Sequence, residues 1–119
     1  MHVEWVRDFC LTFKDVEECQ PFGPEHLVYK IKGKMFLLLS LDEIPPRVNV
    51  KTNPERSIEL RESYPDNILP GYHMNKKHWN TILVNADLPE DLFFQLIDES
   101  YSLVYLSLSK KRRDELTLG

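Results

Sequence analysis

The stretch from residue 27 to residue 41 constrains the fold of this chain more than any other. Over residues 27–32 the side chains alternate between two sides, which is the period of a β-strand. One side has Leu27, Tyr29 and Ile31, and the other has Val28, Lys30 and Lys32. Gly33 supplies a turn, and residues 34–41 return as a second strand that is apolar on both faces. The pattern therefore predicts a hairpin whose second strand is central and well covered.

Three further segments have strand character. Residues 47–51 place Val48 and Val50 inward, and no helix fits between this segment and the hairpin, so we expect antiparallel pairing. Residues 72–75 are a short strand candidate. Residues 79–84 are a stronger one, because they are rich in residue types that favour strands.

Three segments are predicted to be helical. Residues 2–18 have apolar positions at intervals of three and four, namely Val3, Val6, Cys10, Phe13 and Val16. Asn53 and Pro54 are typical of an N-cap and a first helical position, and that helix should run to about Ser63. Residues 89–108 carry the broad apolar face of a third helix.

The predicted order is helix, three strands, helix, two strands, helix. It favours an α+β fold of two layers, α-β(3)-α-β(2)-α, with one antiparallel five-stranded sheet and helices packed on one face. The 119 residues suffice for one domain, residues 1–119, and are too few for two.

The sequence shows no membrane or export signal. The longest uncharged apolar run, residues 35–41, is far shorter than the roughly 20 residues of a membrane helix. The first residues lack the basic start and apolar block of a signal peptide. We therefore expect a cytoplasmic, monomeric protein with no membrane partner.

The cysteines are Cys10 and Cys19. If both lay on the first helix they would be about 13 Å apart, at roughly 1.5 Å per residue, which is too far for a disulfide. Buried structural thiols are the simpler interpretation. A catalytic cysteine is the alternative, but the nearby sequence offers no activating partner.

The net charge of -4 is unevenly spread, because residues 30–51 hold five basic and two acidic groups. Strand alternation predicts that the sheet face without helices carries Lys30, Lys32, Arg47, Asn49 and Lys51, with Phe36 among them. Such a face favours phosphate binding. The alternative is a solvated face whose lysines discourage edge pairing.

Residues 70–80 are the most concentrated candidate binding segment, since they carry basic and aromatic groups and no acid. The candidate site residues in it are Tyr72, His73, Asn75, Lys76, Lys77, His78 and Trp79. Together with the basic face they would grip phosphates and stack on a base or sugar. The alternative for the tryptophan is a core anchor.

A metal site is weakly indicated. The spacing of His73 and His78 suits neither one face of a strand nor a helical zinc pair. Hydrogen-bonded loop histidines are the better interpretation, so we expect no metal and no cofactor.

A basic run occupies residues 110–113. Cations suit the negative end of a helix dipole, so the run is predicted to lie in the last turn of the third helix. A binding arm is the alternative.

Enzyme motifs are absent from the sequence, with no nucleophile elbow, phosphate loop or dinucleotide fingerprint. Asp42 and Glu43 are adjacent and should face apart, which suits acid–base catalysis poorly. We expect no catalytic residues and no enzymatic activity.

Several short motifs resemble one family. They are Pro21-Phe22-Gly23, Tyr29-Lys30-Ile31, Gly33-Lys34-Met35-Phe36, Val48-Asn49-Val50-Lys51, Pro70-Gly71-Tyr72-His73-Met74-Asn75-Lys76, His78-Trp79-Asn80-Thr81 and Ser100-Tyr101. In this order they are similar to the MmcQ/YjbR-like family of small bacterial proteins. The resemblance implies a compact α+β domain with a CyaY-like, secretion-chaperone-like sheet, and a similarity to the double-wing DNA-binding domain of a phage transcription factor. It implies no catalytic residues.

Two functions follow as expectations. The first is binding of double-stranded DNA through the basic sheet face and residues 70–80. The alternative is a protein- or peptide-binding adaptor that resembles secretion chaperones and binds no nucleic acid.

Overall fold

The computed structural model describes residues 3–71, 74–84, 87–111 and 113. The elements in this part of the chain are α1 (Val3–Thr12), β1 (Val16–Cys19), β2 (His26–Ile31), β3 (Lys34–Ser40), β4 (Arg47–Lys51), α2 (Pro54–Ser63), β5 (Ile68–Pro70), β6 (Trp79–Leu83) and α3 (Glu90–Ser107). The strands of the described residues form one antiparallel sheet in the order β1-β2-β3-β4-β6-β5. The predicted α+β fold is confirmed, with six strands in place of five.

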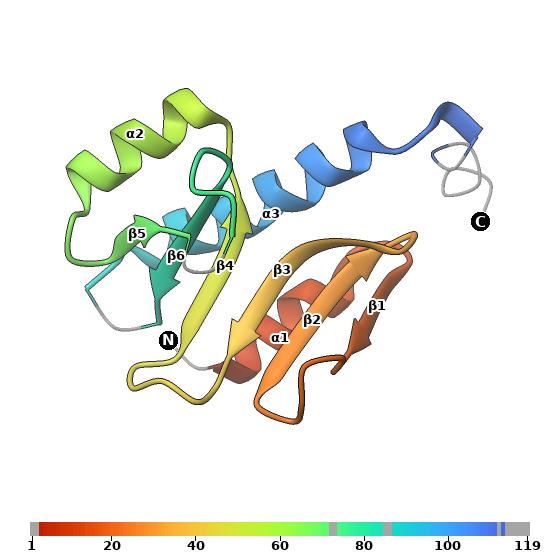
Figure 1. The fold of residues 1–119 in the computed structure, drawn as a ribbon, viewed down its shortest axis with the longest axis horizontal. Coiled ribbons are helices and arrows are strands. Elements are labelled where there is room, and N and C mark those ends of the chain that lie inside the picture. Colours follow the sequence, from red (N-terminus) through yellow and green to blue (C-terminus); the bar gives the residue numbers. More distant parts are fainter. Residues whose placement is uncertain (1–2, 72–73, 85–86, 112, 114–119) are drawn as a thin grey trace.

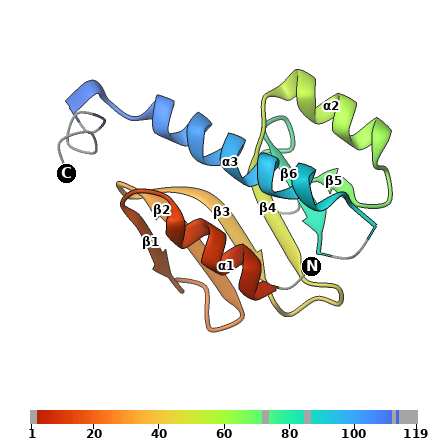
Figure 2. The same cartoon turned by 180° about the vertical axis from the view of Figure 1, so that it is seen from behind.

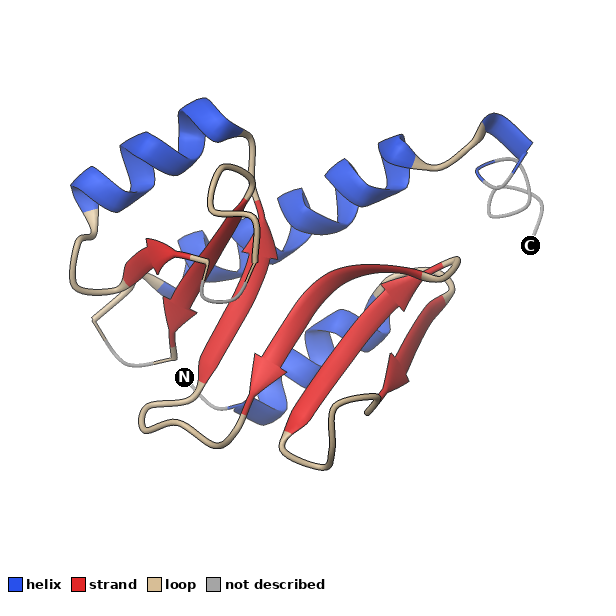
Figure 3. Cartoon of the chain, in the orientation of Figure 1, coloured by secondary structure: helices blue, strands red, loops and turns tan. Residues whose placement is uncertain are grey.

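The helices leave one face of the sheet open. Figures 1 and 2 show α1 and α3 on the same face, while α2 lies beside β5 at the edge of the sheet. Figure 3 shows the same two layers by element type. The predicted cap of α2 is confirmed, since the Asn53 side chain accepts a hydrogen bond from the Glu55 amide at 3.0 Å.

The first predicted helix is too long. It ends at Thr12, and Val16–Cys19 forms the edge strand β1 against β2. Asp15 has a left-handed φ of 57°, which reverses the chain between the two elements. The apolar spacing was misleading because Val16 also packs against the core when its segment is a strand.

The β2–β3 hairpin is confirmed, with one irregularity. Lys32 and Gly33 form its turn, with φ values of 49° and 83°, so Lys32 is a turn residue rather than the predicted strand residue. The register shifts after Tyr29, and Phe36 is the extra residue on β3. This bulge turns Phe36 toward the helices, where it is fully buried against Tyr101 at a ring distance of 5.3 Å. The prediction that Phe36 lies on the open face is therefore wrong.

The strand that pairs with β6 was also misplaced. It is β5, and the predicted strand at 72–75 is absent from the described residues of that range, Met74 and Asn75. Tyr72 and His73 lie outside the described residues. Gly71 ends the pairing through a hydrogen bond from its amide to the Trp79 carbonyl at 2.9 Å.

α3 joins the two halves of the sheet. Figure 3 shows β3 and β4 diverging toward one end, beyond their last paired residues, Leu37 and Val50. Ser100 of α3 lies there, fully buried. Its hydroxyl donates to the Phe36 carbonyl and accepts from the Lys51 amide at 2.8 Å. One side chain therefore satisfies backbone groups that two separating strands leave unpaired.

α3 ends before the basic run. Its last residue is Ser107, and Leu108 is extended, so the prediction that residues 110–113 lie in its last turn is wrong. The described residues of that range instead follow in a separate helical turn. Across the described residues, no helix combines the length and hydropathy that crossing a bilayer requires.

Candidate functional site

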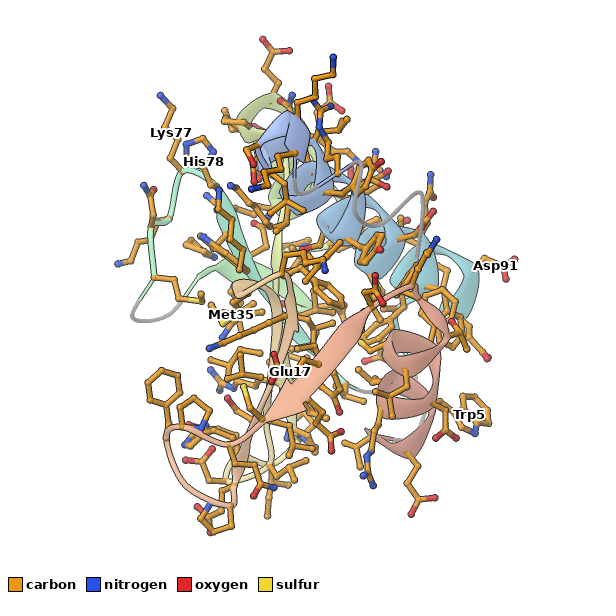
Figure 4. The ribbon with its side chains drawn as sticks, turned by 90° about the vertical axis from the view of Figure 1, so that its right-hand side faces the viewer. Trp5, Glu17, Met35, Lys77, His78 and Asp91 are labelled. Carbon is orange, nitrogen blue, oxygen red and sulfur yellow. The ribbon has the colours of Figure 1, made fainter. Side chains whose placement is uncertain are left out.

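The open face of the sheet contains a hollow of about 660 Å³. Its residues come from four strands and three loops: Phe22, His26, Met35, Leu38, Ser40, Asp42, Glu43, Arg47, Asn49, Met74 and Thr81. Figure 4 shows Met35 on the opposite side of the sheet from Trp5 of α1 and Asp91 of α3. The hollow is therefore bounded below by the sheet and is not covered by α1 or α3.

The strand register determines which side chains meet in the hollow. His26 pairs with Ser40 across β2 and β3, and Ser40 pairs with Arg47 across β3 and β4. Directly paired residues lie on the same face, with Cβ atoms about 5 Å apart. These three side chains consequently form one row across the hollow, although they are far apart in the sequence.

The polar side chains of the row have specific partners. His26 Nδ1 lies 3.3 Å from Ser40 Oγ, and His26 Nε2 lies 3.5 Å from Asp42 Oδ2. The Arg47 guanidinium is 3.8 Å from a Glu43 carboxylate oxygen. Its Nε atom is buried and has no hydrogen-bond partner among the described residues. The hollow thus combines a hydroxyl, an imidazole, two carboxylates and an incompletely paired guanidinium.

The base of the hollow combines one apolar side chain, Leu38, with the polar side chains of Asn49 and Thr81. Leu38 lies two residues before Ser40 on β3, and therefore on the same face. Asn49, only 5% exposed, accepts a hydrogen bond from the Thr81 hydroxyl across β4 and β6. Asn49 is on the predicted face, but its side chain is buried and hydrogen-bonded within the sheet rather than exposed to solvent.

The fold and the hollow can be compared with known proteins. The family model described as YjbR matches residues 11–103 of the chain. The chain belongs to the YjbR family. It is 40% identical to the uncharacterized protein YbdF of Escherichia coli O157:H7 over 98% of this chain and 94% of that protein. It is 32% identical to the uncharacterized protein YjbR of Escherichia coli strain K12 over 95% of each.

Solved structures agree with the family assignment. Protein DR2400 of Deinococcus radiodurans has a TM-score of 0.91 and 38% identity, covering 97% of this chain and 87% of that one. A protein from Pseudomonas syringae has a TM-score of 0.72 and 26% identity, covering 87% of this chain and 98% of that one. The predicted YjbR-like resemblance is confirmed.

In this YjbR-family chain the predicted cations do not form one cluster. Lys30 is on the open face, but its direct partner on β1 is Glu17. Lys51 lies beyond the hollow, paired with Trp79 at the start of β6. Asp42 and Glu43 add negative charge to the rim, so the open face carries both signs of charge.

The lysines of residues 70–80 project from a well-anchored turn. Lys76 and Lys77 are exposed, and the Lys77 amide donates to the Asn75 side chain at 2.9 Å. The Thr52 amide donates to the His78 carbonyl at 2.7 Å, which places this turn beside the end of β4. Figure 4 shows Lys77 and His78 on the same side of the sheet as Met35.

Arg61 of α2 anchors the same turn, and the sequence analysis missed it. Its guanidinium donates to the carbonyls of Lys76 and Trp79 and, at 2.7 Å, to the Asn80 side chain. Burial lowers the pKa of Arg61 from its ordinary value. Arg61 is one of two arginines on a polar helix and gave no sequence signal, because its partners come from another part of the chain.

The remaining candidates are the two cysteines, Trp79 and a metal site. Cys10 and Cys19 are free, and Cys19 lies on β1 rather than on the first helix. Burial raises the pKa of the Cys10 thiol, so this group is protonated and unreactive at neutral pH. Trp79 is half-buried, and its backbone and Cβ pack against Gly71. Within the described ranges no cluster of three or more His, Cys, Asp or Glu side chains is arranged to hold a metal ion.

Proposed function

We propose that the open sheet face is a docking site for an extended segment of a partner protein. The observation that carries this proposal is the hollow itself, since most ligand sites are concave and largely apolar. Met35, Leu38 and Met74 supply apolar lining. Methionine adapts its shape to different partners, which suits a surface that accepts peptide segments.

Exposed apolar side chains lie in two loops that contribute residues to the hollow. Phe22 in the β1–β2 loop is 67% exposed, and Ile44 in the β3–β4 loop is 99% exposed. The two loops are adjacent, because the Leu41 amide donates to the Glu25 carbonyl at 2.8 Å. Phe22 lines the hollow and Ile44 follows the lining residue Glu43, and large exposed apolar groups near a hollow are typical of protein interaction sites.

The charged residues at the rim of the hollow indicate which partner segments would bind. Asp42 and Glu43 lie beside the apolar lining, and the Arg47 guanidinium is 3.8 Å from the Glu43 carboxylate. A segment with a large apolar side chain next to a lysine or arginine complements this arrangement. Nucleic acid phosphates would meet the same two carboxylates, which argues against the hollow as a phosphate site. The resemblance to secretion chaperones supports docking by analogy only.

An array of immobilised nine-residue peptides tests the proposal. Half of the peptides carry an apolar residue beside lysine or arginine, and matched peptides carry glutamate in place of the basic residue. We expect retention of the basic set, and a loss of roughly 5- to 30-fold in Ile44→Ser, because that change removes about 1–2 kcal/mol of apolar contact.

Ile58→Ser is the matched control, since Ile58 is 57% exposed on α2 and lies outside the hollow. It should leave retention unchanged. Asp42→Asn should reduce the preference for basic over glutamate peptides. Equal retention of the two peptide sets, or equal losses in Ile44→Ser and Ile58→Ser, would remove the support for docking.

A second function, duplex DNA binding, is favoured by the anchored lysine turn. Lys76 and Lys77 are exposed, and Lys51 lies beside them where β4 pairs with the start of β6. This end of the face is basic, whereas the hollow is lined by Asp42 and Glu43 as well as Arg47. Exposed lysines on an anchored backbone turn are suited to phosphate contacts.

Fluorescence anisotropy with a labelled duplex at rising salt tests DNA binding. If both lysines contact phosphates, the log–log salt slope should flatten by about two units in Lys76→Ala/Lys77→Ala, at roughly 0.9 per contact. Lys110→Ala/Lys111→Ala is the charge-matched control and tests the C-terminal basic run as an arm. Absence of binding by the folded wild type at low salt would end the DNA proposal.

A further inference from the structure

The hollow contains a hydroxyl, an imidazole and a carboxylate in sequence, and docking of a peptide does not require that arrangement. We propose that Ser40, His26 and Asp42 act as nucleophile, base and positioning residue in the hydrolysis of small esters with an apolar acyl group. This activity goes beyond the docking function and does not depend on it.

The distances define the role of each ring nitrogen. Asp42 lies 3.5 Å from His26 Nε2, so the carboxylate favours the tautomer that carries its proton there. Nδ1 is then an unprotonated acceptor, and Ser40 Oγ lies 3.3 Å from it. This is the logic of a Ser–His–Asp triad with the two ring nitrogens exchanged. Such hydrogen bonds are often long without substrate and shorten when it binds.

Arg47 supplies the group that a developing oxyanion needs. It is the direct cross-strand partner of Ser40, so its side chain begins about 5 Å from the nucleophile on the same face. Its Nε–H has no hydrogen-bond partner among the described residues, but it is buried, and a substrate oxygen reaches it only if the Arg47 side chain turns. The guanidinium lines the hollow, and its positive charge there stabilises negative charge that forms during acyl transfer.

The apolar lining defines the substrate class. Leu38 and Met35 precede Ser40 on β3 and line the same hollow. An acyl chain attached to a carbonyl at Ser40 would lie over these side chains. The hollow of about 660 Å³ accommodates a small ester and is within the usual size of small-molecule sites.

The reaction balances with water as the second substrate. Ser40 Oγ attacks the carbonyl carbon and gives its proton to His26 Nδ1, while the carbonyl electrons move to the oxygen beside Arg47. The tetrahedral adduct collapses, the C–O bond to the alcohol breaks, and the alcohol leaves with the proton from His26. Water then attacks the acyl-Ser40 ester, gives its proton to His26, and releases the acid as Ser40 regains a proton.

An alkyl fluorophosphonate is the direct probe, because it phosphonylates an activated serine and loses fluoride. Intact mass and peptide mapping of the whole chain should show one adduct, at Ser40. Hydrolysis of p-nitrophenyl butyrate should be measurable in parallel. Ser40→Ala should lose both, while Ser63→Ala, which removes an exposed serine at the end of α2, should lose neither.

The base and its partner are tested separately. His26→Gln should slow labelling by about 100-fold or more, as expected for loss of general base catalysis. Asp42→Asn should slow it by roughly 10-fold, and Asp42→Glu should restore most of the rate, because it returns a carboxylate to the ring. Circular dichroism verifies that each variant is folded. If Ser40→Ala is unfolded, Ser40→Cys is used instead, and its rate of alkylation by iodoacetamide reports whether the side chain at this position is activated.

Three results would overturn the proposal: no adduct after prolonged exposure, an adduct elsewhere in the chain, or an unchanged rate in His26→Gln. Peptide retention on the array is measured with the wild-type protein, separately from the labelling experiment. Peptide retention without labelling removes only the hydrolase, and labelling without peptide retention removes only docking.

Discussion

Replacement of Ser100 by alanine should destabilise the protein more than the loss of one hydroxyl suggests. The side chain is fully buried and serves both the Phe36 carbonyl and the Lys51 amide, at the point where β3 and β4 separate. Each buried backbone group left without a partner costs about 1–3 kcal/mol. The two groups together predict a loss of about 2–6 kcal/mol.

Urea denaturation followed by circular dichroism measures this loss. Ser102→Ala is the control, because Ser102 is exposed on the same helix and reports the effect of alanine on helix propensity alone. The melting temperature should fall by about 8–24 °C in Ser100→Ala, at roughly 4 °C per kcal/mol for a domain of this size.

Hydrogen exchange locates the damage. In Ser100→Ala the Lys51 amide should exchange much faster, while the Val48 amide, within the paired part of β4, should stay protected. A stability within about 0.5 kcal/mol of the wild type, or an unchanged Lys51 amide, would refute the argument that Ser100 holds the separating strands.

Two further changes test other parts of the fold. Burial alone would raise the pKa of Glu18, but hydrogen bonds from Tyr29 and Arg7 outweigh it and hold the pKa below the ordinary value of 4.5. The Glu18 carboxylate therefore stabilises the fold above pH 4.5, and this stability is lost as the pH falls through the lower folded-state pKa. In Glu18→Gln, the free energy of unfolding measured in urea should fall less steeply over that acid range. An equally steep fall would contradict this. Gly71→Ala should lower the free energy of unfolding by about 1–3 kcal/mol, because the new Cβ would lie 2.8 Å from the Trp79 carbonyl oxygen and Cβ. Thermal denaturation measures this loss. An unchanged stability would show that β6 moves away from the new methyl group at little cost.

Local sequence patterns predicted most elements but missed β1 and misplaced β5. Asn53 with Pro54, and the alternation before Gly33, specify backbone geometry within a few residues, so α2 and the β2–β3 hairpin were predicted correctly. Residues 16–19 fit a helix by apolar spacing, because Val16 and Cys19 are three residues apart. Pairing with β2 makes them a strand instead, and such pairing is a long-range contact.

The candidate site was less predictable than the fold. Alternation correctly placed Arg47 and Asn49 on the open face, but the bulge after Tyr29 reversed Phe36. The row of His26, Ser40 and Arg47 depends on the register of three strands, which no single stretch of sequence reveals.

The sequence alone determined the α+β class, the hairpin, the helix cap and the family, because these depend on residue type and on neighbours along the chain. Tertiary structure alone decided that an edge strand follows α1, that Ser100 holds β3 and β4 where they part, and that an apolar hollow with a mixed-charge rim occupies the open face. The physical reason is that register, bulges and loop contacts are set by packing between segments distant in the chain, and these decide which side chains meet.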